Sequence, residues 1–442
     1  MATLTSRPLG SAPTDPVGNR PPAGLVALAA AVVAVVVFPL LYLLWRAVGV
    51  GPWPGVYPLA RLVQLAVNTL VLVAAVVVAS AVIGFTTAWL TTRTDLKARR
   101  MWSTVAVLPL VIPSYVGALA LLGATGRRGL ITELIAPFGW GPVPIPQGFW
   151  GAALALTLFT YPYVHLTLVP AFRSLDPSLD EAARGLGVPP RRIFWTITLP
   201  QISPAIRNAS LLVALYTMAD FGAVSLLRYD TFTRAIFLQY AGRLDRRPAT
   251  ILAAVLIVLA VVLIQVERKS RRRMDVRGGR AVRPHRPIGL GRHAQWGAQS
   301  FLVVLGLFSL VLPISILIRW WIRGTLAGRE TVAVWEELSR SLGISAGAAV
   351  MIVLVSVPLA VLTVRYRSLM GQATETAAWT VFALPHITVG LAVLLTGVSL
   401  LLPLYQSLVL LLFAYLMMFL PQALGTAQVA LRKVSPSMEE AS

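Results

Sequence analysis

The sequence contains no cysteine, which excludes disulfide bonds, thiolate metal sites and a cysteine nucleophile. Charge is also scarce: 12% of the 442 residues are charged and 57% are hydrophobic, whereas soluble domains contain roughly 25% charged residues. Lysine occurs only at Lys97, Lys269 and Lys433, and none of them lies in the G-x-x-x-x-G-K-S/T pattern of a phosphate-binding loop. These absences exclude an ordinary soluble enzyme, a disordered chain and an ATPase of the phosphate-loop type.

Long apolar runs are what the chain has instead. Most approach the roughly 20 residues that a helix needs to cross a bilayer, and they do not alternate as the strands of a membrane β-barrel do. The first run, 24–48, is too long for the apolar core of a signal peptide, so we expect an uncleaved helix. We therefore predict an all-α integral membrane protein with about ten transmembrane helices. They are expected at 24–48, 65–91, 101–123, 148–170, 205–227, 248–266, 298–322, 340–364, 376–398 and 401–424.

The basic residues predict the orientation of these helices, because cytoplasmic segments of membrane proteins are enriched in Lys and Arg. With the N-terminus in the cytoplasm, the inner segments carry 25 and the outer segments 13 of the 38 Lys and Arg residues. Segment 268–273 is the strongest inner anchor, whereas loop 228–247 places five arginines on the predicted outer side. Since the basic residues lie between apolar runs, we expect membrane lipid and no nucleic acid as a partner.

An internal repeat divides the chain. Residues 171–183, AFRSLDPSLDEAA, match residues 430–442, ALRKVSPSMEEAS, at six of 13 positions with an offset of 259 residues. We therefore predict two tandem bundles and expect the second to be incomplete, because it stops within the element that continues to residue 200 in the first. The predicted segments are a disordered cytosolic tail (1–23), a first helix (24–48), a first bundle (60–266), a basic cytosolic linker (267–297), a linking helix (298–322) and a second bundle (338–442).

Proline interrupts one apolar stretch in each half, LPLVIPSYVG at 108–117 and LPHITVG at 384–390. Such a break is either a tolerated kink or part of a pathway or gate. A carboxylate among apolar residues is a functional candidate by default, although Asp220 could equally stay in water or bond a neighbouring helix. His165 and His386 favour helix–helix hydrogen bonds over a place on the pathway. The pathway candidates are Pro109, Pro113, Pro385, His386 and Asp220. No spacing predicts a metal site, and no bound cofactor is expected.

Segment 176–200, DPSLDEAARGLGVPPRRIFWTITLP, lies between two predicted spans. Asp176 before Pro177 is typical of a helix start, and Gly187 is typical of the turn that follows a helix end. A second short helix is expected to stop at Pro200. We predict two short amphipathic helices at a bend on the cytoplasmic side, and the apolar face of the first comprises Leu179, Ala182, Ala183 and Leu186.

The spacing of EAA, the following glycine and the Leu-Pro pair resembles the EAA loop of type I ATP-binding-cassette importer permeases. The resemblance implies that this loop docks on a separate ATPase subunit, which hydrolyses ATP, so the chain itself would not be an enzyme. The residues that it implies for coupling are Glu181, Ala182, Ala183, Gly187, Leu199 and Pro200, with Glu440 and Ala441 in the second copy. The other reading is an amphipathic helix at the membrane interface without a partner.

Segment 220–240, DFGAVSLLRYDTFTRAIFLQY, resembles permeases of ferric-iron importers, which fuse two permease domains in one chain. This resemblance covers most of 60–442 and implies a multi-pass subunit of the bacterial cytoplasmic membrane. The implied partners are two ATPase subunits and an external substrate-binding protein. Thiamine, sulfate and phosphonate stay open as substrates, because related permeases serve them.

Two other classes of function were weighed. An ion-coupled secondary transporter also has repeats and broken helices, but the EAA spacing and the scarcity of acidic residues in the spans argue against it. A membrane enzyme would need a nucleophile or metal constellation, and the sequence contains no such cluster.

Overall fold

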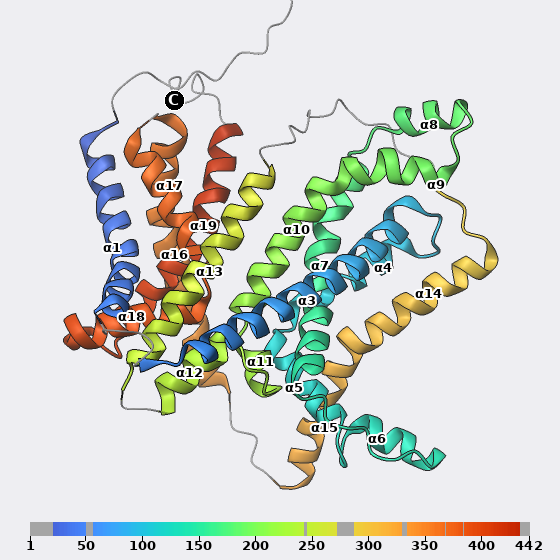
Figure 1. The fold of residues 1–442 in the computed structure, drawn as a ribbon, viewed down its shortest axis with the longest axis horizontal. Coiled ribbons are helices and arrows are strands. Elements are labelled where there is room, and N and C mark those ends of the chain that lie inside the picture. Colours follow the sequence, from blue (N-terminus) through green and yellow to red (C-terminus); the bar gives the residue numbers. More distant parts are fainter. Residues whose placement is uncertain are drawn as a thin grey trace, which may run out of the picture. The chain divides into compact units, whose positions relative to one another are not determined.

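The computed structural model describes residues 21–49, 56–242, 245–271, 287–328, 334–366, 368–382 and 384–433. Throughout these residues the regular structure is helical, apart from an isolated bridge between Thr94 and Ile288 (Figure 1). Seven helices are long and apolar enough to cross a membrane, and two bent helix pairs bring the number to nine. The prediction of an all-α integral membrane protein is confirmed. Most of the predicted tail, 1–20, and residues 272–286 of the predicted linker lie outside the described residues.

The seven spans agree with predicted apolar runs. They are α1 (Ala23–Val48), α3 (Leu59–Arg93), α7 (Phe149–Arg173), α13 (Arg247–Arg271), the continuous run of α14, η4 and α15 (Arg292–Leu326), α16 (Trp335–Arg365) and α19 (Leu408–Lys433). The predicted run 205–227 is not among the seven spans or the two bent pairs. It is covered by α10 (Leu199–Ala219) and α11 (Gly222–Leu226). α10 carries Arg207 and Asn208 in its first half, so it is too polar to be counted among the nine.

Both proline-interrupted stretches are broken helices. The run of α4 (Arg99–Val105) and η1 (Leu108–Val111) meets α5 (Ser114–Ala124) at an angle of 94°. In the second copy, α17 (Leu369–Phe382) and α18 (His386–Leu400) meet at 108°. Because proline has no N–H to donate to the preceding turn, a break at such a residue leaves fewer backbone groups unsatisfied than elsewhere.

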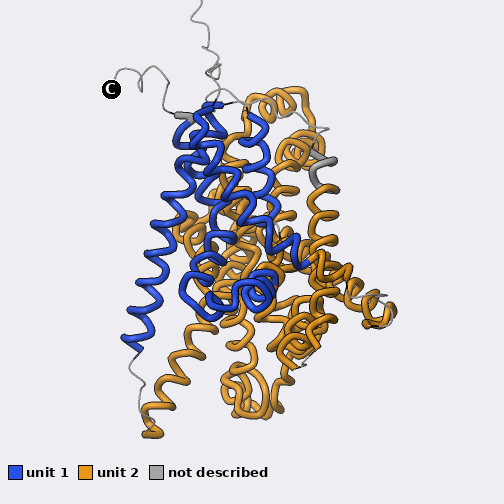
Figure 2. Tube along the Cα trace, turned by 90° about the vertical axis from the view of Figure 1, so that its left-hand side faces the viewer, with its two compact units in different colours: residues 1–43, 334–382, 392–442 blue, residues 44–333, 383–391 orange. Residues whose placement is uncertain are grey.

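The chain forms two compact units, coloured separately in Figure 2. One comprises 44–333 with 383–391, and the other comprises 1–43, 334–382 and 392–442.

The first unit is built around α3 and α7, which lie along each other, with α10 covering both. A Cβ at Gly84 of α3 would lie 2.7 Å from the carbonyl oxygen of Tyr161 in α7, so only glycine allows this approach. Ser80 Oγ and Thr160 Oγ1 share a hydrogen bond of 2.8 Å between the same helices. Small residues and polar bonds are what hold helices together in lipid, where apolar surfaces gain little from meeting.

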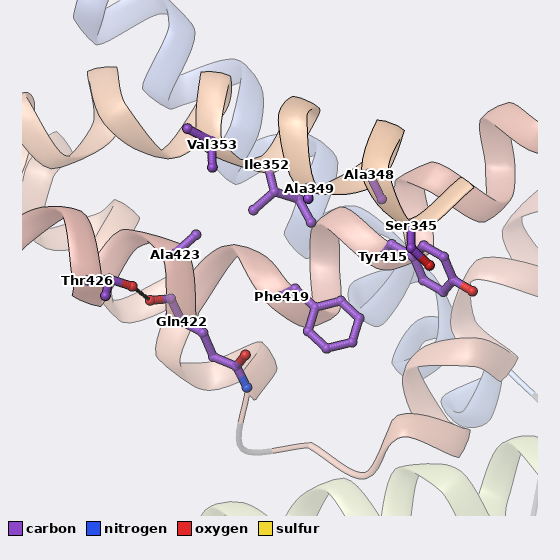
Figure 3. A pocket seen from close by; sticks show the side chains of 10 residues that line it. All are labelled: Ser345, Ala348, Ala349, Ile352, Val353, Tyr415, Phe419, Gln422, Ala423 and Thr426. Carbon is purple, nitrogen blue, oxygen red and sulfur yellow. Dashed lines mark hydrogen bonds between the residues drawn. The ribbon is translucent and has the colours of Figure 1, made fainter. Parts of the chain in front are cut away.

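The second unit repeats the helix pair with α16 and α19. Both α7 and α19 contain an internal proline, Pro162 and Pro421, at the offset of 259 residues. A groove of about 520 Å³ runs between α16 and α19 (Figure 3). Its lining includes small residues of α16, such as Ala349, and Phe419 and Gln422 of α19.

Candidate functional site

The EAA segment forms a short helix with both ends capped. α8 (Pro177–Gly185) follows α7, and the N–H of Ser178 donates to Asp176 Oδ1 at 2.9 Å. At its other end Gly187 has φ +78°, and the N–H of Val188 donates to the carbonyl of Ala183 at 3.0 Å. The bond from Val188 and a second one, from the N–H of Gly187 to the carbonyl of Arg184 at 2.9 Å, form a Schellman motif, which satisfies carbonyls at the helix end. The predicted helix start and end are confirmed.

The two faces of α8 differ in burial. Asp180 and Ala183, one turn apart, face the bundle and are buried. Leu179 and Leu186 instead face away, with 51% and 84% of their surfaces exposed, and Glu181, Ala182 and Gly187 are exposed with them. Of the four members of the predicted apolar face, only Ala183 is buried, so most of this face is exposed. An exposed apolar face of this kind is typical of a site that contacts another protein or a membrane.

An ion pair that the sequence analysis missed anchors α8 to the bundle. Arg93, the last residue of α3, donates through Nη2 to Asp180 Oδ2 at 2.8 Å, and the side chains are 5% and 11% exposed. The guanidinium also lies 5.7 Å from the ring centroid of Trp89. Since removing one partner would leave the other charge buried, this pair fixes the place of α8 relative to α3.

The segment after α8 does not end at Pro200. α9 (Pro190–Ile193), the π-helical turn η3 (Phe194–Thr198) and α10 follow one another, and Pro200 is the second residue of α10. The prediction that Pro200 stops a helix is wrong. In the π turn the N–H of Leu199 donates to the carbonyl of Phe194, five residues back. We infer that this wider turn accommodates the proline, whose ring would clash with the carbonyl of an ordinary preceding turn.

Aromatic rings hold this second part of the segment. The ring of Phe194 lies 5.4 Å from Trp89 and 6.1 Å from Phe85, both in α3. Phe172 of α7 completes the cluster, with its centroid 5.5 Å from that of Trp89. The two parts of the EAA segment, α8 and η3, are therefore both attached to the same end of α3.

Asp220 bonds two neighbouring elements. It follows α10, and its Oδ1 accepts from the N–H of Ala223 in α11 at 2.9 Å. The hydroxyl of Ser114, the first residue of α5, donates to Asp220 Oδ2. Of the alternatives open at the sequence level, the bond to a neighbouring helix is therefore observed. The carboxylate joins α11 to α5 immediately after the break at Pro113.

The other candidates are spread over the molecule. Pro109 is buried in η1, and Pro113 precedes α5. Pro385 and His386 begin α18, where the carbonyl of Pro385 accepts from Thr388 Oγ1 at 2.6 Å. Glu440 and Ala441 lie outside the described residues.

His165 supports the prediction of a helix–helix bond. Its Nδ1 lies 3.0 Å from Thr87 Oγ1 and its Nε2 lies 3.2 Å from Ser103 Oγ. In the part of the chain that the structure describes, no three His, Cys, Asp or Glu residues are grouped as metal ligands would be.

Known proteins resemble this chain over most of its length. Residues 80–276 match the family of binding-protein-dependent transport system inner membrane components. The chain is 28% identical over 430 residues to the Fe(3+)-transport system permease protein FbpB 2 of Haemophilus influenzae, covering 96% of this chain and 81% of the relative. It is 26% identical over 401 residues to the putative ferric transport system permease protein FbpB 1 of the same organism, covering 86% and 63%. It is 27% identical over 223 residues to the sulfate transport system permease protein CysT of Synechococcus elongatus, covering 47% and 79%.

Proposed function

The chain belongs, through residues 80–276, to the inner membrane components of binding-protein-dependent transport systems, and from this premise we propose that it is the permease subunit of an ATP-binding-cassette importer. The observation that carries the proposal is α8, a capped helix with an exposed apolar face and a buried ionic anchor. The chain provides the path through the membrane and hydrolyses nothing itself. Two ATPase subunits supply the energy, and an external binding protein delivers the substrate.

Coupling runs through the EAA segment. The ATPase subunit docks on Leu179, Ala182 and Leu186, with Glu181 beside them, because apolar side chains bind a partner by leaving water. Movement of α8 then reaches α3 through the Arg93–Asp180 pair. Movement of the following segment reaches α10 directly, since η3 continues into it.

The pathway lies at the broken helices. Asp220 and Ser114 hold the break between η1 and α5 against α11, so a movement of α10 is applied next to the break. Pro109, Pro113, Pro385 and His386 are the residues at which the two copies change direction, and we assign them to the gate.

Ferric iron is the proposed substrate, on the strength of the two Haemophilus influenzae relatives. The described residues contain no group of acidic side chains suited to holding Fe(III) tightly, so the tight site belongs to the binding protein. Sulfate is the second candidate, because the sulfate permease of Synechococcus elongatus aligns over 79% of its own length.

The orientation follows from the same proposal. Docking of an ATPase on α8 requires this loop and the N-terminus of the chain to lie in the cytoplasm of a bacterium. Loop 228–247, the weakest point of the charge count, carries arginines that are paired: Arg234 with Asp230, and Arg247 with Asp245 at 2.9 Å.

A docking experiment tests the function. Leu186→Asp should weaken co-purification of the ATPase subunit by about ten- to hundredfold, since burying one leucine is worth about 1.5–3 kcal/mol, and uptake in proteoliposomes should fall with it. The matched control is Leu134→Asp, which alters an exposed leucine of α6 (Leu130–Ile135), away from α8. Equal ATPase binding and uptake in wild type and Leu186→Asp would disprove the coupling role.

A further inference from the structure

The helix run Arg292–Leu326 lies against the first bundle from one end to the other. It has 35 residues, and at 1.5 Å per residue it is about 50 Å long. The residues that lead into it, Ile288 and Leu290, are bonded to Arg93 and Asp95, at the end of the bundle that holds α8. Its last residues contact α6, which precedes α7, whereas α8 follows α7. We call these the coupling end and the opposite end of the bundle.

Three backbone-level bonds tie the run at the coupling end. The N–H of Ile288 donates to the carbonyl of Arg93 at 2.8 Å, and the N–H of Asp95 donates to the carbonyl of Ile288 at 3.1 Å. Asp95 Oδ1 accepts from the N–H of Leu290 at 2.8 Å. Arg93 also pairs with Asp180 of α8. The segment 93–95 is therefore bonded both to the EAA helix and to the residues that lead into α14.

Apolar contacts continue this attachment into the span. Leu96, which follows the segment 93–95, forms a buried cluster with Ala298 and Leu302 of α14, and Trp102 lies against this cluster. One turn further on, Leu305 of α14 joins Phe159 of α7 in a second buried cluster.

The middle of the run is irregular at one place, the π-helical turn η4 (Leu307–Val311). It lies beside η1, the segment that carries Pro109 and precedes the break at Pro113. Ser309 of the turn is fully buried and donates to the carbonyl of Leu305 at 2.7 Å. A π turn in a helix is a point at which the backbone bonds are interrupted and the helix can bend.

Ion pairs tie the run at the opposite end. Arg319 and Arg323 of α15 both donate to Glu133 of α6, at 2.5 Å and 3.1 Å. The hydrogen bond from Arg319 lowers the pKa of Glu133 to about 2, so the carboxylate stays ionised at neutral pH. Trp320 fits against Gly123 of α5, where a Cβ would lie 2.5 Å from the indole ring.

The loop around α6 is held together internally. The N–H of Val143 donates to Thr132 Oγ1 at 3.0 Å, and the N–H of Gly126 donates to the carbonyl of Val143 at 2.8 Å. A force applied to Glu133 is therefore transmitted to the whole of loop 125–147, including Phe138, which is 79% exposed.

We propose that Arg292–Leu326 is a transmembrane strut that carries movement of α8 to loop 125–147, with Asp95 and Glu133 as the positioning residues at its two ends. A helix resists changes in length, so tying both ends makes their displacements depend on each other. The π turn η4 is the point where the strut bends, and it lies next to the break between η1 and α5. This inference depends on the proposed function in one respect only, which is that a docked ATPase moves α8.

The experiment uses the full chain, which lacks cysteine, with a single Phe138→Cys spin label in detergent. In Asp95→Ala the label should become several-fold more mobile, although the substitution is at the coupling end. Asp95→Asn keeps an acceptor oxygen for Leu290 and should restore the wild-type spectrum. Glu133→Ala should mobilise the label more strongly, since it removes both bonds from α15, whereas Asp95→Ala removes one of the three bonds at the coupling end. The double variant should mobilise the label by less than the sum of the two single effects, because both substitutions act on the same strut.

Asp245→Ala is the matched control, since it removes an exposed ion pair with Arg247 that does not involve the strut. The label should not respond to it. An unchanged spectrum in Asp95→Ala, or strictly additive effects of the two cuts, would overturn the proposal. These spectra need no ATPase, so they stand even if α8 proves to have no docking role. Where an ATPase does bind, its addition should shift the spectrum in the intact chain and not in Asp95→Ala.

Discussion

The first and second bundles are built on the same helix pair but differ in what covers it. In the first, α10 lies over α3 and α7, and Thr160 of α7 is completely buried. In the second, the groove between α16 and α19 is open, and Phe419, the residue that corresponds to Thr160 at the offset of 259, is 42% exposed. The same position of the repeated pair is therefore buried between α3 and α7 in the first bundle and exposed in a groove in the second.

The two bundles also differ in their charged contacts. In the first, an ion pair between Arg93 and Asp180 is buried and joins elements distant in sequence. In the described part of the second, the pair between Arg340 and Glu336 is exposed and lies within one helix. In the first bundle, therefore, a buried ion pair joins elements of the tertiary structure.

The largest expected effect sharpens this contrast. Arg93→Ala should lower the free energy of unfolding by about 3–5 kcal/mol, because it leaves Asp180 buried without its partner. Arg340→Ala in the second bundle should change it by about 1 kcal/mol or less, since exposed pairs contribute little. Thermal unfolding in detergent measures both. The swapped pair Arg93→Asp with Asp180→Arg should recover part of the loss, and equal effects of the two alanine variants would break the contrast.

A smaller effect is expected where the helix pairs touch. Gly84→Ala would bring a Cβ to within 2.7 Å of the Tyr161 carbonyl and should cost about 1–3 kcal/mol by overpacking. Ser356 of α16 is also buried but already accommodates a side chain. Ser356→Ala should be nearly neutral in the same unfolding assay. If Gly84→Ala were as mild as Ser356→Ala, the first pair would not depend on close approach.

Single cysteine substitutions test the difference in exposure between positions 160 and 419. Phe419→Cys should react with a small maleimide at least ten times faster than Thr160→Cys, because Phe419 is exposed in the groove (Figure 3), whereas Thr160 is buried against Ser80 of α3. The alkylation rate in detergent provides the measurement. Val353→Cys, another exposed position of the groove, is the positive control. Similar rates at 160 and 419 would mean that the groove is closed in solution.

The smallest expected effect is the response of the first bundle to acid. The pKa of Glu133 is lowered to about 2 by Arg319, so its contribution to stability is fully present above the ordinary carboxyl pKa and is lost as the pH falls through 2. A spin label at 138 should therefore stay immobile to about pH 3 and become mobile near pH 2. In Glu133→Gln this acid step should be absent. A step centred near pH 4.5 in the wild type would show that the ion pairs do not form.

The local features of the coupling segment could be predicted from the sequence. Asp176 before Pro177 and the glycine at 187 specify a helix start and a helix end through bonds within a few residues. The breaks at Pro113 and Pro385 were predicted for the same reason, since proline acts on its own turn. Apolar length was sufficient to predict the fold class and nine of the ten spans.

The contacts between distant residues could not be predicted. Arg93 and Asp180 are 87 residues apart. In the sequence, each is an ordinary charged residue near the end of a predicted helix, and nothing indicates that they pair. The apolar face of α8 was predicted without its burial, because periodicity shows that a face exists and not what covers it. The continuation through Pro200 was missed because a π turn has no distinctive residue pattern, and Leu199 bonds to a carbonyl one residue further back than usual.

That same turn has a geometric consequence. A π turn contains about one residue more than an α turn, and each residue of an α-helix advances the backbone by about 100° around its axis. The extra residue in Phe194–Thr198 therefore sets the direction, around the axis of α10, in which α9 and the bend before it point. Deleting one residue there would turn the bend by about a quarter of a revolution, so the exposed side chains of α8 would face a different direction.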